Sequence, residues 1–128
     1  MSISQPKTLL DLISAAPAEA TAILLPDQGG LRVSYGSLRQ QVQAVADQLA
    51  SLGISAGDRV GIAIPNGLPT IVAFLAASMA GTAAPLNPAY KEEEFKFFLE
   101  DTNARVLLLP PDGGEAARRA AGDSVPVF

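Results

Sequence analysis

The sequence contains neither cysteine nor histidine, and these two absences exclude much of the chemistry that small enzymes use. Without cysteine there are no disulfides and no thiol redox reactions. Without either residue, the usual zinc sites, the Ser–His and Cys–His nucleophile pairs and histidine acid–base catalysis are also excluded. Only carboxylates, hydroxyls, amides, Lys and Arg remain, so we expect no complete catalytic site and no metal site within these 128 residues.

Basic and aromatic side chains are also scarce. Nine Lys and Arg stand against thirteen Asp and Glu, and Arg118–Arg119 is the one adjacent basic pair. A net charge of −4 with dispersed basic residues disfavours binding to nucleic acid or to an anionic membrane surface. With five Phe, two Tyr and no Trp, a core must consist mainly of Ala, Val, Ile and Leu. The 48% hydrophobic content still predicts a globular chain.

Long hydrophobic runs suited to a membrane are missing. Residues 60–90 carry no charge, but Pro, Asn and Gly interrupt them, and the main apolar stretch covers only 71–84. A bilayer requires roughly 20 apolar residues, so we expect a buried helix and no membrane span. The N-terminal apolar stretch is short and contains Asp11, which is unlike a secretory signal, and the expected location is therefore cytoplasmic.

The first part of the chain is expected to form a helix, a hairpin and a second helix. Residues 1–20 contain a short amphipathic helix at 8–16, and residues 21–35 predict a β-hairpin with Pro, Asp and Gly in its turn. Ser34 is a suitable N-cap and Gly53 a suitable terminator for the helix between them. Its expected buried stripe is regularly spaced: Leu38, Val42, Val45, Leu49 and Leu52.

From Asp58 onward, strands and helices alternate. Strands are expected at 59–64, 82–86, 105–110 and 124–128, with helices at 71–80, from 92 onward and at 115–121. Each connection is long enough for a crossover, so residues 36–128 predict an α/β unit with a parallel sheet. The expected fold is therefore a partial doubly wound, mainly parallel sheet with helices on both faces, preceded by a short β-hairpin.

Two local expectations concern the apolar segments of this unit. Residues 71–80 are apolar on every side, so this helix is expected to be buried all round, with Phe74 in the core. The chain stops within the apolar run Val125–Phe128, where domains seldom finish. We interpret the chain as a fragment of a larger N-terminal domain, whose exposed sheet edge favours self-association.

Two loops are candidates for ligand binding. No phosphate-binding Gly-rich motif is present, and the run Glu92–Glu94 cannot converge on one ion because successive helical residues point apart. The segments Ile64–Gly67 and Pro85–Tyr90 follow buried strands, at the sheet edge where α/β proteins bind ligands. Asn66, Asn87 and Tyr90 are the candidate ligand-facing side chains. The alternative is that both Asn residues cap or brace their turns.

Three segments resemble a known family. Residues 34–67 (SYGSLRQQ…IAIPNG), 72–101 (VAFLAASM…KFFLED) and 104–109 (ARVLLL) are similar, in this order and spacing, to the N-terminal part of the adenylate-forming acyl-CoA synthetases, the AMP-dependent synthetase and ligase family. The similarity covers about residues 8–109. AAPLNPAYKEEEFKFFLED is most similar to the oxalate-activating and peroxisomal-type CoA ligases. Pro69 and Lys91 depart from the residues often found in the family at these two helix starts.

The resemblance implies an activity for a longer parent enzyme. A carboxylate attacks the α-phosphate of ATP in the presence of Mg²⁺, and CoA then displaces AMP to give a thioester. The family's catalytic and cofactor-binding motifs lie beyond the stretch that this chain matches, so the resemblance assigns no catalytic residue and no cofactor here. It implies that the partners are the remainder of the enzyme and a small carboxylic acid.

Two other interpretations remain open. The chain could be a stand-alone α/β binding or interaction module without catalysis. A small flavodoxin-like domain is a third possibility, although the acidic cluster of a phosphoacceptor domain is missing and few aromatic residues are available to enclose a flavin.

Overall fold

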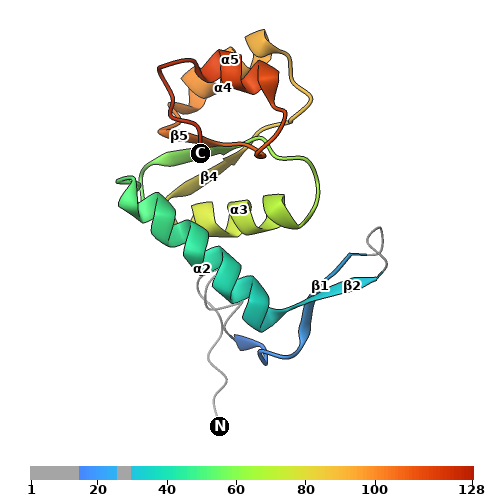
Figure 1. The fold of residues 1–128 in the computed structure, drawn as a ribbon. Coiled ribbons are helices and arrows are strands. Elements are labelled where there is room, and N and C mark those ends of the chain that lie inside the picture. Colours follow the sequence, from blue (N-terminus) through green and yellow to red (C-terminus); the bar gives the residue numbers. More distant parts are fainter. Residues whose placement is uncertain (1–14, 26–29) are drawn as a thin grey trace.

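The computed structural model describes residues 15–25 and 30–128, which form a two-stranded antiparallel sheet followed by a larger α/β unit (Figure 1). The elements run in the order β1 (Thr21–Leu25), β2 (Leu31–Ser34), α2 (Tyr35–Ser51), β3 (Arg59–Ile62), α3 (Leu68–Ala80), β4 (Thr82–Pro85), α4 (Glu92–Thr102), β5 (Val106–Leu108) and α5 (Glu115–Ala121). This order confirms the predicted α/β alternation. Most of the helix expected at 8–16 and the hairpin turn at 26–29 lie outside the described residues.

The hairpin and α2 begin and end as the sequence predicts. β1 pairs antiparallel with β2, and the Ser34 hydroxyl accepts a hydrogen bond from the Ser37 backbone N–H at 3.1 Å. After α2, Gly53 has φ of 87°, the left-handed conformation that favours glycine. Leu52 was expected in the buried stripe but is 50% exposed, because it lies at the C-cap beyond the last regular turn. The buried residues of α2 are Leu38, Val42, Ala46 and Leu49.

The second sheet is parallel, with β3 at its centre. Its strand order is β4-β3-β5, and Gly61 of β3 pairs with Ala84 on one side and Leu107 on the other. The last residues continue the sheet beyond β5, where the Leu107 N–H donates to the Pro126 carbonyl and the Phe128 N–H donates to the Leu107 carbonyl, both at 2.9 Å. This parallel bridge confirms the predicted start of a fourth strand.

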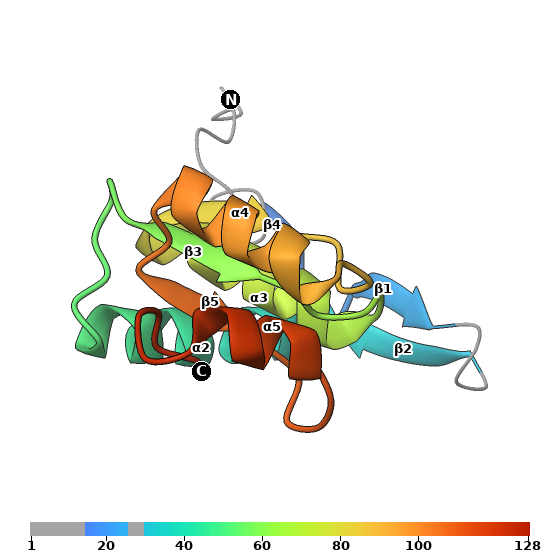
Figure 2. The ribbon, with the colours of Figure 1, turned by 90° about the horizontal axis from the view of Figure 1, so that it is seen from above.

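Helices cover both faces of this sheet (Figures 1 and 2). In β5 the side chains alternate between the faces: Val106 and Leu108 pack in the cluster with α2 and α3, whereas Leu107 packs in the cluster with α4 and α5. In β3, Val60 and Ile62 belong to the α2–α3 side. Burial on both faces explains why these strands read as continuous apolar runs. The expected doubly wound arrangement is confirmed.

Helix α3 is only half buried, which corrects the expectation that it is surrounded by protein. Val72, Ala73, Ala76 and Ala77 are buried, but Phe74 on another face is 41% exposed. The reason is that α3 packs against the sheet and against α2, but no described element covers its remaining side (Figure 1). Across the described ranges, no helix is long and apolar enough to cross a membrane.

A tight turn at Ser55–Asp58 lies beside the amino ends of β3, β4 and β5; it leads into β3 and is bonded to residues at the other two. Asp58 accepts hydrogen bonds from the Ser55 backbone N–H at 2.9 Å and from the Ser55 hydroxyl at 3.2 Å, and Arg105 pairs with its other carboxylate oxygen at 3.3 Å. The Ser55 N–H is the main reason that the pKa of Asp58 lies below its usual value of 3.8, and the Ser55 hydroxyl and Arg105 act in the same direction. The Asp58 carbonyl also accepts from the Thr82 N–H at 2.8 Å.

Gly81 connects this turn to the end of α3. A Cβ placed on Gly81 would lie 2.6 Å from the Asp58 carbonyl oxygen and 2.9 Å from the Ile54 side chain. Real Cβ atoms are not found at such distances, so the close approach of α3 to the 54–58 segment requires glycine.

Phe95, and not Phe74, is the phenylalanine on which the core depends. Phe95 is 1% exposed in the cluster beneath α4 and α5, whereas Phe97 on the same helix is 61% exposed. We expect Phe95→Ala to lower the free energy of unfolding by about 3–5 kcal/mol, and Phe97→Ala by less than about 1 kcal/mol. Urea denaturation of the two variants measures the difference, and equal costs would contradict this account of the core.

Gly81→Ala should destabilise the chain, because the new methyl group collides with backbone atoms of the 54–58 segment. The expected cost is about 1–3 kcal/mol. Gly57→Ala is the matched control, since a Cβ there meets nothing within 4 Å. Thermal unfolding compares the two variants, and an unchanged midpoint for Gly81→Ala would show that α3 does not approach the turn this closely.

Stability should depend on pH through Asp58. Because the pKa of Asp58 is depressed in the folded state, its stabilising contribution is present above its unfolded pKa of 3.8 and is lost as the pH falls through the lower, folded pKa. We therefore expect the stability difference between the wild type and Asp58→Asn to be full at neutral pH and to shrink below about pH 4. Urea unfolding across this range measures it, and a constant difference would contradict the assignment.

Candidate functional site

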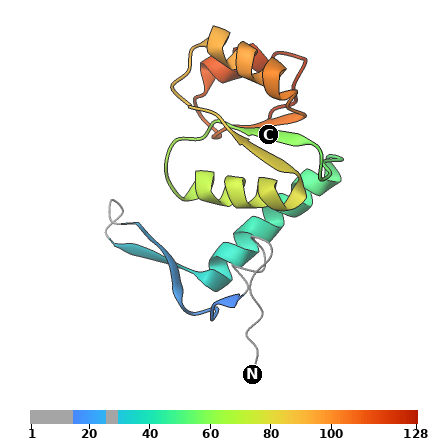
Figure 3. The ribbon, with the colours of Figure 1, turned by 180° about the vertical axis from the view of Figure 1, so that it is seen from behind.

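The connections after β3 and β4 leave the sheet on opposite faces. The loop that follows β3 leads to α3, and the loop that follows the neighbouring β4 leads to α4 on the other face (Figure 3). Where adjacent parallel strands send their connections to opposite faces, a crevice opens at the carboxyl edge of the sheet, and ligands of α/β proteins bind there. The last backbone hydrogen bond between these strands, from the Leu86 N–H to the Ile62 carbonyl at 2.7 Å, lies at the base of this crevice.

A hollow of about 550 Å³ occupies this position. It is lined by Ile62, Ile64, Pro65, Asn66, Thr70, Pro85, Leu86, Asn87 and Pro88. Apolar and proline side chains form most of its wall, and two amides and one hydroxyl supply its polar side-chain groups. The two loops that the sequence indicates therefore meet at one site.

Asn66 lies at this hollow, but it does not cap α3 as the alternative interpretation expected. Gly67 occupies the N-cap with φ of 146°, and no side chain makes a capping hydrogen bond there. Asn66 is thus one residue too early to cap the helix, and within the described part of the chain its amide has no hydrogen-bond partner. Pro69 stands in the first turn, as predicted. The exposed Asn66 amide is therefore available to a ligand.

Asn87 braces its own turn. Its Oδ1 accepts a hydrogen bond from the Ala89 N–H at 2.9 Å, and its carbonyl accepts one from the Tyr90 N–H at 3.1 Å. This is the side-chain-to-backbone turn that Asn commonly forms, so the alternative interpretation holds for Asn87. The same residue lines the hollow, where its position is fixed by these bonds.

Tyr90 packs away from the lining of the hollow. Its ring stacks on Phe98, with centroids 5.0 Å apart, and meets Phe95 edge-on at 5.7 Å. It is a half-buried member of the cluster with α4 and α5, so its ring takes part in packing. Thr70, in the first turn of α3, lines the hollow and was not singled out from the sequence. The signal that could have identified Thr70 is its position shortly after the candidate segment Ile64–Gly67.

The lining of the hollow carries no charge among the described residues. Phosphates need Lys, Arg or a row of backbone N–H groups, and Mg²⁺ needs carboxylate or other oxygen ligands held in octahedral geometry. Two amides and a hydroxyl do not fit either requirement. The hollow can orient a polar ligand by hydrogen bonds, but its side chains provide no acid, base or counter-ion.

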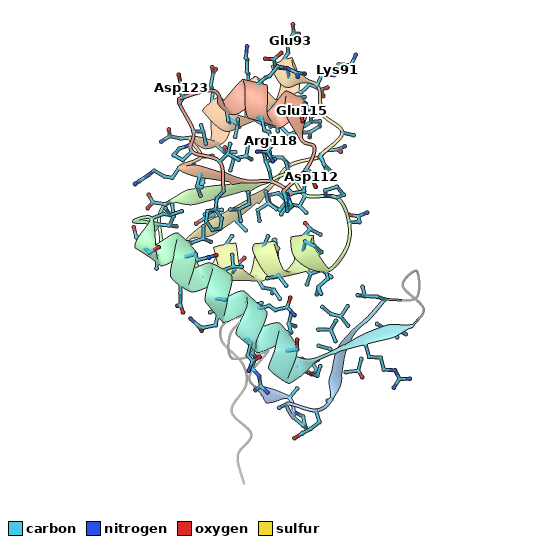
Figure 4. All side chains as sticks on the ribbon, in the orientation of Figure 1. Lys91, Glu93, Asp112, Glu115, Arg118 and Asp123 are labelled. Atoms are coloured by element: carbon cyan, nitrogen blue, oxygen red, sulfur yellow. The ribbon has the colours of Figure 1, made fainter. Side chains whose placement is uncertain are left out.

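Arg118 of α5 and two residues of the acidic run in α4 have structural partners. The Arg118 guanidinium donates to the carbonyl oxygens of Gly113 at 2.9 Å and Pro110 at 2.7 Å, and so holds the loop before α5 (Figure 4). In the acidic run, Glu92 pairs with Lys96 and Arg119, whereas Glu94 accepts from the Lys91 backbone N–H. These carboxylates therefore serve different contacts, as the helical spacing predicts.

A second, apolar groove lies on the other side of the loop that follows β3. It has a volume of about 360 Å³ and extends between the ends of β3 and β5 and helices α2 and α3. Its lining residues are Gln41, Val45, Ile64, Leu68, Pro69, Val72, Ala73, Leu108, Leu109 and Phe128. Ile64 lines both the hollow and the groove, so the segment that precedes α3 separates the hollow, with its amide and hydroxyl groups, from the apolar groove.

Known proteins match almost the whole chain. A probable CoA ligase of Humulus lupulus is 41% identical over 118 residues, which cover 89% of this chain and 22% of the relative. The oxalate–CoA ligase of Arabidopsis thaliana is 38% identical over 111 residues, which cover 80% of this chain and 22% of that protein. The solved structure of ATP-bound MatB from Rhodopseudomonas palustris superimposes with a TM-score of 0.80 at 25% identity, covering 94% of this chain and 24% of that one.

The chain thus spans less than a quarter of the length of these proteins. Residues 13–126 match the AMP-binding enzyme family. The predicted resemblance to the N-terminal part of the adenylate-forming acyl-CoA synthetases is confirmed, and the chain belongs to the AMP-binding enzyme family.

Proposed function

We propose that the chain is the N-terminal unit of an enzyme that converts a carboxylic acid to its CoA thioester. In this reaction a carboxylate oxygen attacks the α-phosphate of ATP and pyrophosphate leaves. The CoA thiolate then attacks the acyl carbon and AMP leaves. The match of residues 13–126 to the AMP-binding enzyme family carries the proposal, and the CoA ligases among its relatives support this reaction class.

The role that we propose for these residues is to build and shape a wall of the site. The hollow at Asn66 and Asn87 has hydrogen-bonding groups but no charge, so it suits a polar, uncharged part of a ligand. The apolar groove beside it suits hydrocarbon or apolar protein side chains. The groups that bind phosphate and Mg²⁺ must come from other parts of the enzyme, because the hollow does not fit them.

Residues 1–128 are, in this proposal, one partial N-terminal domain that works with the rest of its own enzyme. Val127 and Phe128, beside β5, are 38% and 45% exposed. Exposed apolar side chains at the edge of a sheet favour contact with another polypeptide segment, here the remainder of the proposed enzyme. They also support the prediction that the isolated chain self-associates.

The isolated chain should not catalyse ATP–pyrophosphate exchange with any carboxylic acid. The physical reason is that its hollow has neither the charge to hold the phosphates nor an acid–base group. The measurement is radiolabelled pyrophosphate exchange by the purified 128 residues, with the Arabidopsis oxalate–CoA ligase and oxalate as the positive control. Exchange above background by the chain alone would refute the proposed role as an incomplete unit.

A chimera supplies the matching positive test. Replacing the corresponding segment of the Arabidopsis ligase with this chain should give a folded enzyme that still forms oxalyl-CoA, whereas deletion of the segment should abolish activity. A folded but inactive chimera would count against functional equivalence. Tight, stoichiometric nucleotide binding by the isolated chain would instead favour the stand-alone binding module.

A further inference from the structure

The peptide link from Asn66 to Gly67 places a reactive pair of groups at the edge of the hollow between the loops that follow β3 and β4. The chain contains three asparagines, and only Asn66 is followed by glycine. Asn66 is exposed and lies in the loop between β3 and α3. An exposed Asn–Gly step is the arrangement in which a backbone nitrogen most readily attacks a side-chain amide, because glycine has no side chain to block the approach.

The local structure leaves both reacting groups unconstrained. Among the described residues, neither the Asn66 amide nor the Gly67 backbone N–H has a hydrogen-bond partner; Gly67 takes part only through its carbonyl, which accepts from the Ile71 N–H at 3.3 Å. Space around Gly67 is open, since a Cβ built there meets only the Pro69 ring, at 3.7 Å. No contact therefore opposes a rotation of the Asn66 side chain toward the following nitrogen.

We propose that Asn66 is a site of spontaneous deamidation that gives the hollow a negative charge. Hydroxide removes the proton of the Gly67 N–H, and the nitrogen attacks Cγ of Asn66. A C–N bond forms, ammonia leaves, and a five-membered succinimide results. Water then opens the ring at either carbonyl, which gives aspartate or isoaspartate. No oxidant or reductant is needed, because the net change is the replacement of NH₂ by OH with release of ammonia.

The other two asparagines are protected, each for a different structural reason. Asn87 precedes Pro88, whose nitrogen has no proton, and its Oδ1 is held by the Ala89 N–H. Asn103 precedes Ala104, whose N–H donates to the Leu99 carbonyl at 3.3 Å. The fold and sequence thus direct the reaction to one position and supply two internal controls.

The product changes the electrostatics of the candidate site. The lining of the hollow is uncharged before the reaction, and a carboxylate at residue 66 would stand one residue before the N-cap of α3. A helix N-terminus favours a negative charge, so the fold tolerates the aspartate form. Ligands with an anionic group at this edge would be repelled. Isoaspartate would in addition lengthen the backbone between β3 and α3 by one carbon.

The test is to incubate the 128-residue chain in mildly alkaline buffer and to map its peptides by mass spectrometry. The expected result is replacement of NH₂ by OH at residue 66, with up to one ammonia released per chain, while Asn87 and Asn103 stay intact. A synthetic peptide of residues 64–70 serves as the unfolded reference. The rate in the folded chain should stay within about tenfold of the rate in this peptide, because the reaction requires no local opening of the fold.

Two variants complete the design. Asn66→Gln should abolish the reaction at this position, since its longer side chain forms a six-membered ring only slowly, and Asn66→Asp should reproduce the more acidic species in isoelectric focusing. Asp112–Gly113 can also yield isoaspartate, but without loss of ammonia, so the mass change isolates Asn66. An intact Asn66 in the folded chain while the peptide reacts, or equal reaction at all three asparagines, would overturn the proposal.

Discussion

The structure depends on the position of β3 between two parallel partners. β3 pairs with β4 on one side and with β5 on the other, so both of its edges are hydrogen-bonded. Packing is tight at Gly61, where a Cβ would lie 3.1 Å from the side chain of Leu107 in the neighbouring strand β5 and 3.7 Å from that of Leu99 in the covering helix α4. Parallel neighbours require crossover connections, and these place α3 on one face and α4 and α5 on the other. The two cores follow from this one pairing.

The candidate site follows from the same constraint. Because the chain leaves β3 and β4 on opposite faces, their two loops separate and a hollow forms between them. Asn87 is fixed there by its turn, whereas Asn66 is held only by the backbone that leads to Gly67. Among the described residues, an amide without a hydrogen-bond partner and an amide held by its turn therefore line the same hollow. This arrangement shapes a candidate ligand site whose lining carries no charge among the described residues.

The sequence predicted those features that local physics decides. The burial of β3 and β5, the cap at Ser34 and the bounds of α5 all depend on side-chain pattern within a few residues. Other features depend on how the elements pack in three dimensions, and the sequence pattern does not determine them. Phe74 was expected in the core because α3 is apolar all round, but only the layer arrangement determines which side is covered. The stacking of the candidate residue Tyr90 on Phe98 was likewise beyond prediction, because helix geometry in three dimensions sets that contact.

If the fold depends on β3, this strand should be the last element to open, and native-state hydrogen exchange tests this most directly. The Ala63 N–H, which donates to the Leu108 carbonyl at 3.0 Å, continues the pairing of β3 with β5 and is buried. Its exchange should require global unfolding, so that its opening free energy equals the stability from urea denaturation. The amides of the β1–β2 hairpin should exchange with a lower opening free energy. If Ala63 opens as easily as the hairpin, β3 does not organise the fold and the account is wrong.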